Sequence, residues 1–299
     1  MQVVSKNKDY ELLDMANGEK LERWGKYILI RPDPQIIWSK KENPKLWDKA
    51  DARYIRSNTG GGHWELKNSL PASWTTSFDN LTFNIKPMGF KHTGLFPEQY
   101  TNWMYMCHKI KEKLKRNPNR EIKVLNLFAY TGGATVACLA AGASVCHVDS
   151  SKGMVTWAKE NVKSSGLEDA PVRYIVDDVV KFVKREIRRN NKYDAIVMDP
   201  PSYGRGATGE VWSIEKDLEN LTNLCVELLS DEPLFYIVNT YTGGLSGTVI
   251  SNLLNIVMKE KNTSLLDMGK ITTEEIGIEC TSSGLVLPCG ITTKWERCK

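Results

Sequence analysis

The sequence predicts an α/β protein in which a mostly parallel β-sheet covered by helices follows a smaller region rich in strands. From about residue 98, apolar runs of strand length alternate with longer segments of helical spacing, as in sheets whose strands are joined by helical crossovers. Before that point, short β-branched runs are separated by turn residues. We therefore expect two domains, residues 1–88 and 89–299.

In the first region, Tyr27–Ile30 is predicted as a strand and Asn17-Gly18 as a tight turn. Five of the nine tryptophans of the chain lie here: Trp24, Trp38, Trp47, Trp64 and Trp74. Lysines and arginines lie between them, so the aromatics could form a nucleic-acid surface or the core and rim of a small β-barrel. The structural interpretation is favoured, and RNA or substrate binding by residues 1–88 is the alternative.

The second region begins with a helix from Gln99 to Arg116, whose apolar residues recur on one face. Strands are then predicted at 122–128, 144–148, 172–176, 193–198 and 234–239, and helices at 133–141, 151–164, 178–189, 213–230 and 246–260. Beyond residue 262 no long helix is expected. Three short runs, 264–266, 276–278 and 285–287, are predicted as closing antiparallel strands.

The composition is that of an ordinary globular protein, with 41% hydrophobic and 25% charged residues. Seven cysteines form no C-x-x-C pair and four histidines have no zinc-ligand spacing, which favours reduced thiols, no metal and a cytoplasmic location. No segment has the length and apolarity of a membrane span, so no membrane partner is expected. The formal charge of +4, of which residues 1–86 carry +3, permits an anionic partner.

Informative residues follow four of the predicted strands, and ligands bind beyond the carboxyl ends of open parallel sheets. The first exit, 126–133, reads Asn-Leu-Phe-Ala-Tyr-Thr-Gly-Gly, whose glycines allow close approach of a ligand. It lacks G-x-G-x-x-G, which argues against a dinucleotide. Asp149 ends the second strand and is suited to ribose hydroxyls. The third exit is Asp177-Asp178, where Asp178 is suited to cap the next helix, or one of the two carboxylates faces an adenine amino group. Together the exits indicate an adenosyl ligand.

The fourth exit is Asp199-Pro200-Pro201-Ser202-Tyr203. Its prolines make the backbone rigid and forbid a helix, and its carbonyls are expected to be free to accept hydrogen bonds. With a carboxylate and an aromatic ring, the segment suits a flat molecule that bears N–H groups. The loop 204–212 that follows is either an ordinary surface loop or a substrate-ordering lid.

These residues resemble the class I S-adenosylmethionine (SAM)-dependent methyltransferases, and more closely the group that methylates cytosine or guanine in large-subunit ribosomal RNA. The resemblance covers about residues 90–245 and rests on the segments 93–99, 126–133, Asp149-Ser150, Asn161 with Gly166-Leu167, Asp178 and 199–203. It implies a Rossmann-like fold with a mostly parallel seven-stranded sheet, and SAM as the cofactor.

The resemblance also implies roles for individual residues. The cofactor-binding residues would be Gln99, Phe128, Tyr130, Thr131, Gly132, Gly133, Asp149, Ser150, Asp178 and Asp199. The glycine turn would hold the methionine part of SAM, with Gln99 at its carboxylate, Asp149 at the ribose and Asp178 at the adenine amine. Asp199, Pro200, Pro201 and Tyr203 would be the catalytic residues and would face the acceptor.

One departure from the family bears on the chemistry. Methylation of cytosine at C5 requires a cysteine nucleophile, which those family members carry after the strand that here reads 235–239. This chain has Thr240-Tyr241-Thr242-Gly243-Gly244 there, and Cys289 is a remote candidate better explained as a structural thiol. We therefore predict methyl transfer to a nitrogen, or an oxygen, of an RNA base. The alternatives are a small molecule or a protein side chain as acceptor, a nicotinamide-dependent oxidoreductase, and a binding module without turnover.

Overall fold

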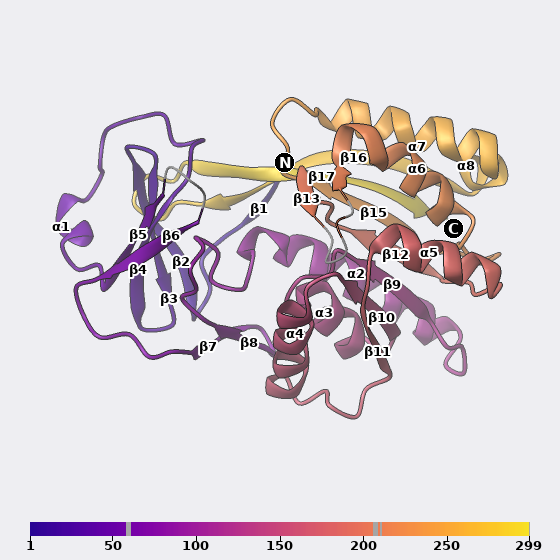
Figure 1. Cartoon of the computed structure of the whole chain (residues 1–299), viewed down its shortest axis with the longest axis horizontal. Coiled ribbons are helices and arrows are strands. Elements are labelled where there is room, and N and C mark those ends of the chain that lie inside the picture. Colours follow the sequence, from indigo (N-terminus) through magenta and orange to yellow (C-terminus); the bar gives the residue numbers. More distant parts are fainter. Residues whose placement is uncertain (58–60, 206–208, 210, 299) are drawn as a thin grey trace. The chain divides into compact units, whose positions relative to one another are not determined.

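A computed structural model describes residues 1–57, 61–205, 209 and 211–298 of the chain (Figure 1). The chain divides into two compact units. Unit 1 comprises Met1–Thr101 and Ile276–Cys289, and unit 2 comprises Asn102–Glu275 and Gly290–Lys299. The units differ from the predicted ranges because a segment near the carboxyl terminus belongs to unit 1. That residues 1–88 form a domain of their own stays a prediction.

Unit 2 is built on a core of five parallel strands in the order β15-β12-β9-β10-β11. They are β9 (Lys123–Leu127), β10 (Ser144–Asp149), β11 (Val172–Val176), β12 (Ala195–Met198) and β15 (Phe235–Thr240). The chain passes from β9 outward through β10 to β11, and then returns to β12 on the other side of β9. The strand order therefore reverses between β9 and β12, which is where such sheets bind ligands.

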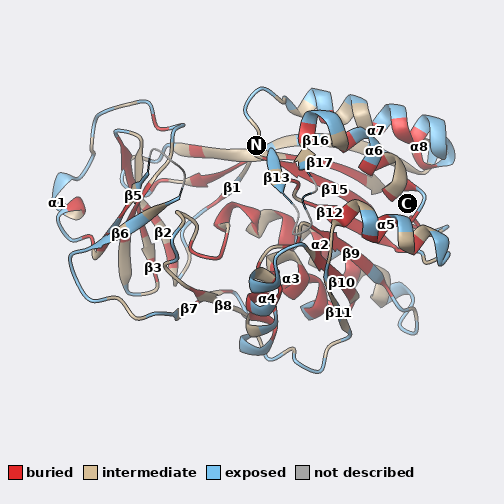
Figure 2. Cartoon of the chain, viewed as in Figure 1, coloured by how far each residue is buried: buried red, intermediate tan, exposed pale blue. Residues whose placement is uncertain are grey.

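The six helices predicted for this part of the chain lie close to their expected ranges. They are α2 (Tyr100–Arg116, whose first two residues belong to unit 1), α3 (Gly133–Ala140), α4 (Lys152–Ser164), α5 (Val179–Arg188), α6 (Ile214–Val226) and α7 (Gly247–Lys261). Residues of α5, α6 and α7 share one buried cluster with the strands (Figure 2). Because crossovers are right-handed, the reversal of strand order puts α3 and α4 on one face of the sheet and α5 on the other.

The whole sheet has eight strands in the order β1-β16-β17-β15-β12-β9-β10-β11. The closing strands are β16 (Gly269–Glu279) and β17 (Val286–Arg297), of which β17 pairs antiparallel with β15. The predicted α/β class is confirmed. The sheet has one strand more than the seven expected, because β1 (Gln2–Val4) adds to β16 in parallel.

The predicted strand at 264–266 is wrong, because these residues belong to a short helix, α8 (Ser264–Met268). Leu265 is fully buried there, and its carbonyl accepts a hydrogen bond from the indole Nε1 of Trp295 at 2.9 Å. One helical turn buries this leucine and gives the indole N–H its acceptor. Tertiary packing, rather than local propensity, therefore selects the helix here.

Unit 1 contains a five-stranded sheet in the order β2-β3-β4-β5-β6 and a separate hairpin. The elements are β2 (Tyr10–Ala16), β3 (Glu19–Trp24), β4 (Tyr27–Pro32), α1 (Pro44–Trp47), β5 (Ala52–Arg56), β6 (Gly62–Leu66), β7 (Trp74–Phe78), β8 (Leu81–Ile85) and the 3₁₀ helix η1 (Pro97–Gln99). Asn17 and Gly18 join β2 to β3 with φ of 53° and 74°, so the predicted tight turn is confirmed.

The tryptophans of unit 1 are mainly structural. Trp24 and Trp47 are buried. The half-buried Trp38, Trp64 and Trp74 each donate the indole N–H to a backbone carbonyl, at 2.8 to 3.0 Å. Rings fixed in this way favour the core interpretation over an open stacking surface.

A buried ion pair lies in the centre of the unit 1 sheet. The carboxylate of Glu22 is fully buried and accepts hydrogen bonds from Arg31 Nε at 2.6 Å and Nη2 at 2.8 Å, and from the Tyr10 hydroxyl at 2.8 Å. Burial opposes ionisation of Glu22, but the nearby cations Arg31 and Lys20 and these hydrogen bonds lower its pKa to about 2. The pair is therefore charged at neutral pH.

Candidate active site

The four predicted exits lie along one edge of the unit 2 sheet. Because β12, β9, β10 and β11 are parallel neighbours, their carboxyl ends meet at the same edge. Leu127 is the register partner of Met198, so Phe128 and Asp199 leave adjacent strands at the same level. The structure thus brings the first, second, third and fourth exits together. Gln99 belongs to η1 in unit 1, and its role toward the cofactor stays a prediction.

The turn between β9 and α3 has an unusual backbone. Phe128, Tyr130 and Gly132 all have positive φ, of 53°, 51° and 82°. For residues other than glycine this conformation costs on the order of 1–3 kcal/mol, and it persists only where the surroundings enforce it. Support comes from Asn161, whose buried side chain donates Nδ2–H to the carbonyl of Thr131 at 2.8 Å. The turn is therefore held open as a preformed loop at the edge of the sheet.

Asp149 fixes the same turn from β10. Its Oδ2 accepts the backbone N–H of Tyr130 and its Oδ1 that of Ser151, both at 2.8 Å. Burial raises the pKa of Asp149, although the two backbone donors act in the opposite direction. Each carboxylate oxygen keeps a second lone pair, so the group can still accept hydrogen bonds from ligand hydroxyls. Ser150, beside it, is exposed.

A buried row of hydrogen-bonded polar side chains lies behind the turn, and it was not predicted from the sequence. Asn126 donates Nδ2–H to Thr135 Oγ1 at 2.9 Å, and that hydroxyl lies 2.9 Å from His147 Nδ1. All three are buried. A methyl group at Gly132 would lie 3.1 Å from Ala158 Cβ and 3.5 Å from His147 Cε1. Glycine is thus required at 132 by close packing as well as by φ.

Because His147 is held neutral, acidification is expected to destabilise the protein. Burial lowers the pKa of His147 from 6.5 to about 4, so the unfolded chain takes up this proton first. The stabilisation is complete above pH 6.5 and is lost as the pH falls toward 4, by about 3 kcal/mol. Urea unfolding at neutral pH and near pH 4 should show that His147→Gln lacks this part of the pH dependence. Equal losses in wild type and variant would contradict the assignment; His92 is present in both and cancels.

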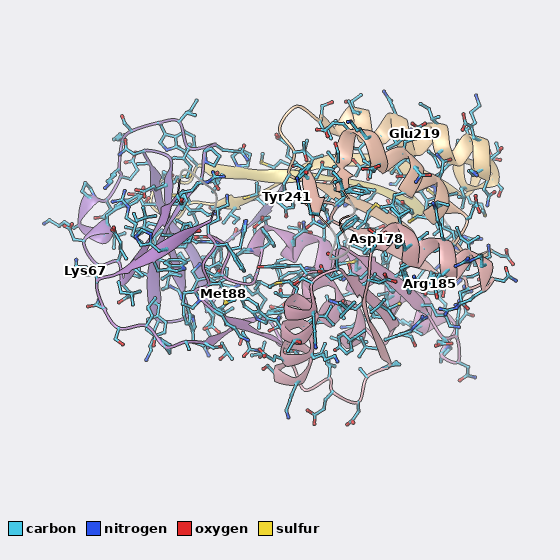
Figure 3. All side chains as sticks on the ribbon, in the orientation of Figure 1. Lys67, Met88, Asp178, Arg185, Glu219 and Tyr241 are labelled. Carbon is cyan, nitrogen blue, oxygen red and sulfur yellow. The ribbon has the colours of Figure 1, made fainter. Side chains whose placement is uncertain are left out.

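The third exit contains a cap and an ion pair. Asp178 Oδ1 accepts the backbone N–H of Lys181 at 2.8 Å, so the residue is the N-cap of α5. Its neighbour Asp177 forms an ion pair with Arg185 of α5; Figure 3 labels Asp178 and Arg185. The capping role leaves Asp178 Oδ2 for a ligand donor, so capping and the predicted contact with adenine are compatible.

At the fourth exit Asp199 is half-buried, Pro200 is buried and Tyr203 is 57% exposed. The expectation that the loop carbonyls are free is wrong at two positions. The carbonyl of Pro201 accepts the indole N–H of Trp212 at 2.7 Å, and that of Ser202 accepts the N–H of Ile214 at 3.1 Å. Proline has no backbone N–H, so a proline-rich loop has few hydrogen-bond donors. This loop is instead held in place through two of its carbonyl acceptors.

Trp212 comes from a short hairpin of β13 (Tyr203–Arg205) and β14 (Val211–Ser213). Its ring also packs on Phe128, with centroids 5.0 Å apart. One side chain therefore contacts both the turn after β9 and the loop after β12. Of the predicted lid, residues 206–208 and 210 lie outside the described residues.

No cysteine directly follows any of the five parallel strands of unit 2, β9, β10, β11, β12 and β15. At the end of β15 stands Thr240, which is 2% exposed. Beside it the carboxamide oxygen of Asn239 accepts hydrogen bonds from Asn102 Nδ2 at 3.0 Å and Thr292 Oγ1 at 2.8 Å. Cys289 belongs to unit 1, where burial, with Glu98 nearby, raises the pKa of its thiol well above the usual range. A thiol held protonated is a poor nucleophile.

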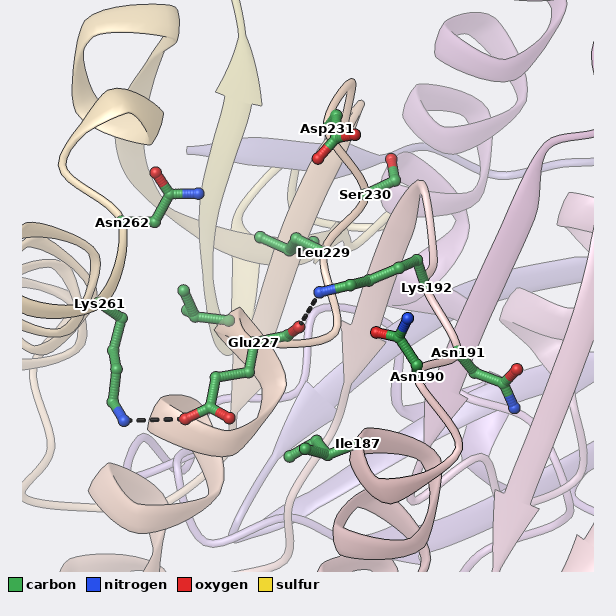
Figure 4. A pocket seen from close by; sticks show the side chains of 11 residues that line it. Ile187, Asn190, Asn191, Lys192, Glu227, Leu229, Ser230, Asp231, Lys261 and Asn262 are labelled. Atoms are coloured by element: carbon green, nitrogen blue, oxygen red, sulfur yellow. Dashed lines mark hydrogen bonds and ion pairs between the residues drawn. The ribbon is translucent and has the colours of Figure 1, made fainter.

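A cavity of about 340 Å³ lies at the opposite end of the strands (Figure 4). Its lining includes the residues that precede β12 and those that precede β15, among them Lys192 and Asp231. Lys192 Nζ donates to the carbonyl of Glu227 at 2.7 Å, and Lys261 Nζ lies 2.8 Å from Glu227 Oε1. Both lysines therefore bind Glu227, the C-cap residue of α6. The cavity is separate from the predicted site.

The described residues show two further absences. They contain no group of three or more His, Cys, Asp and Glu side chains arranged to hold a metal ion. Nor does any helix in these ranges have the length and apolarity needed to cross a membrane.

A mostly parallel sheet with a preformed turn, carboxylates and a proline-rich loop at its switch point is the architecture of proteins that bind nucleotide-type cofactors. The chain belongs to the S-adenosylmethionine-dependent methyltransferase family, whose model matches residues 68–239. It is a SAM-dependent methyltransferase, and SAM is its cofactor. The residues present fit that cofactor, because Asp149 and Asp178 each retain acceptor capacity beside the open turn.

The relatives agree on the class. A SAM-dependent methyltransferase from Agrobacterium tumefaciens is 35% identical with a TM-score of 0.90, over 99% of this chain and 92% of that one. The SMU.776 protein complexed with SAH shares the fold, with a TM-score of 0.72 at 18% identity over 97% of this chain and 76% of that one. Ribosomal RNA large subunit methyltransferase K/L of Shewanella frigidimarina is 33% identical over 150 residues, 50% of this chain and 20% of that protein. The match thus spans about a fifth of the length of these curated relatives.

Proposed function

We propose that the chain transfers the methyl group of SAM to a nitrogen of an RNA base, in ribosomal RNA. The observation that carries the proposal is the loop after β12, where a half-buried carboxylate and an exposed tyrosine stand at the switch point and no thiol directly follows any of the five parallel strands. The Shewanella relatives, named as ribosomal RNA methyltransferases, support an RNA acceptor. A cytoplasmic location and contact of residues 1–88 with RNA belong to the same proposal.

The proposed chemistry requires little more than positioning. SAM supplies an activated methyl group and a good leaving group. Asp199 would accept an N–H of the acceptor base and orient its lone pair, Pro200 and Pro201 would keep the carboxylate in place, and Tyr203 would stack on the ring. A new N–C bond forms as the S–C bond breaks, and one proton leaves the nitrogen for Asp199 or water, after transfer if necessary.

The roles proposed for the cofactor residues follow the same geometry. Phe128, Tyr130, Thr131, Gly132 and Gly133 would hold the methionine part through the open turn, which the hydrogen bonds of Asn161 and Asp149 support. Asp149 and Ser150 would take the ribose, Asp178 the adenine amine and Gln99 the carboxylate end.

The test is mass spectrometry of nucleosides from total RNA of cells with and without the gene. We expect one N-methylated nucleoside to disappear, and to be restored by wild type and by Cys289→Ala but not by Asp199→Ala. Asp169→Ala, an exposed aspartate in the turn after α4, is the matched control and should restore it. Loss of product in folded Cys289→Ala would overturn the heteroatom chemistry. An unchanged RNA profile, with methyl transfer to a small molecule or a protein in extracts, would overturn the RNA acceptor.

A further inference from the structure

We propose that the exposed side of α5, together with Arg173 of β11, binds the phosphodiester backbone of the RNA whose base enters the site. This inference rests on the proposed function. We call this surface the α5 basic face. It consists of Arg173, Lys181, Lys184, Arg185, Arg188 and Arg189.

Positive charge is dense in the segment that contains this face, which has the same net charge as the whole chain. Residues 171–192 carry seven Lys/Arg against three Asp/Glu, a net charge of +4. The whole chain has 40 and 36, so all other residues together carry 33 of each kind and are neutral. A local excess of this size attracts polyanions even though the overall charge is small.

Helix α5 separates its apolar and basic residues cleanly. Val179, Phe182 and Val183 are buried in the core of unit 2. Lys181, Lys184 and Arg188 are exposed and follow one another at intervals of three and four residues, so they share one side of the helix. They span about 10 Å along the helix axis, which is enough to follow a chain of phosphates rather than a single anion.

Two arginines of the face, Arg173 and Arg189, are held in place by a buried carboxylate. The fully buried Glu186 accepts hydrogen bonds from Arg173 at 3.3 Å and from Arg189 at 3.1 Å, as well as from Tyr193 and Asn191. Burial acts to raise the pKa of Glu186, but these hydrogen bonds together lower it. The side chains of Lys184 and Arg188 make no hydrogen bond or ion pair with other described residues. Their positive charges are therefore not compensated within the protein.

The location favours RNA over a membrane. Asp178, at one of the strand exits of the site, caps α5. The helix runs from that edge back along the sheet for about 15 Å, so the basic face leads from the edge where the base would be methylated toward the opposite end of the strands. An interfacial membrane helix inserts apolar side chains between lipids. The large apolar side chains of α5 are instead buried or partly buried against the core, and its exposed side is cationic.

The test compares two double variants of the full chain. Lys184→Gln/Arg188→Gln removes two charges from the face. Lys111→Gln/Lys115→Gln is the matched control, because it removes two exposed lysines, also four residues apart and near the end of a helix, from α2. Each protein is titrated with a fluorescein-labelled single-stranded RNA of about 20 nucleotides between about 50 and 200 mM salt. Melting temperature and Kd for SAM are measured in parallel and should not change.

We expect the face variant to bind this RNA about 20-fold more weakly at 0.1 M salt, and its log K against log salt to be shallower by about 1.4. Its KM for RNA should rise while kcat at saturating RNA stays the same. Equal weakening in both variants would overturn the basic face but leave RNA methylation standing. If wild type neither binds nor methylates RNA, the proposed function fails and the inference with it. Loss of binding to phosphatidylserine vesicles, with RNA binding intact, would assign the face to a membrane instead.

Discussion

Asparagine at position 149 is expected to weaken SAM binding at least a hundredfold, about 3 kcal/mol. Asp149 accepts a backbone N–H at each oxygen, from Tyr130 and from Ser151. An amide replaces one of these oxygens by an NH₂ group, which then faces an N–H donor, so the turn after β9 opens or the side chain leaves it. In either case the carboxylate proposed to accept hydrogen bonds from the ribose is lost. Isothermal titration of the variant with SAM measures the effect.

The control is Asp169→Asn, which changes the same charge at an exposed position after α4 and should leave the Kd for SAM unchanged. Titrations are made well below the melting temperature of each protein, so that loss of fold is not read as loss of binding. A folded Asp149→Asn protein with wild-type affinity would show that the carboxylate neither shapes the turn nor meets the cofactor.

Arg31→Met is expected to destabilise the protein by about 3–5 kcal/mol, because it leaves the buried carboxylate of Glu22 without its hydrogen-bonded cation and with only Lys20, 3.9 Å away, as an ion-pair partner. Arg31 is 4% exposed and supplies two of the three hydrogen bonds that the carboxylate accepts. Urea denaturation followed by tryptophan fluorescence suits the measurement, since the guanidinium also lies 5.4 Å from the ring of Trp24.

The double variant Glu22→Gln/Arg31→Met separates an unpaired charge from lost packing. It should recover more than half of the stability, because the buried carboxylate that lost its partner is gone and Lys20 keeps its ion pair with Asp33 at 3.4 Å. In the wild type, Glu22 contributes stability that is present above pH 4.5 and lost as the pH falls toward 2. A double variant no more stable than Arg31→Met would point to packing as the main contribution of the arginine.

The alternation of elements in unit 2 was predictable because each buried strand is a short apolar run and each helix has its own apolar stripe. The wrong prediction of a strand at 264–266 arose because these patterns do not distinguish a strand from a helix in so short a run. Ser264, Leu265 and Leu266 fit either a strand or one helical turn, and the choice depends on Trp295, some thirty residues away. Likewise, the exchange of Ile276–Cys289 into unit 1 depends on pairing over nearly the whole chain length, which no local pattern encodes.

The site was predictable to the extent that its residues follow strands. Gly132, Asp149, Asp178 and Asp199 each stand at a change from apolar to polar sequence. The hydrogen-bonded row of Asn126, Thr135 and His147 was not predictable, because each of these residues lies inside an apolar segment of a different element. A buried histidine and asparagine in neighbouring strands are a signal that could have been used. The positive charge of α5 was not noticed because it was counted together with the rest of residues 87–299, which are net acidic without the segment 171–192.

The contacts of Trp212 have a consequence for the order of events in a catalytic cycle. Its indole joins Pro201, in the loop proposed to face the acceptor, to Phe128, in the turn proposed to face the cofactor. A ligand that shifts Phe128 must therefore alter the environment of the acceptor loop, and the energetic effect is reciprocal by thermodynamic necessity. We expect the affinity for the acceptor to depend on whether SAM or SAH is bound. Through this one aromatic side chain the enzyme would then distinguish the methyl donor SAM from its product SAH before an acceptor binds.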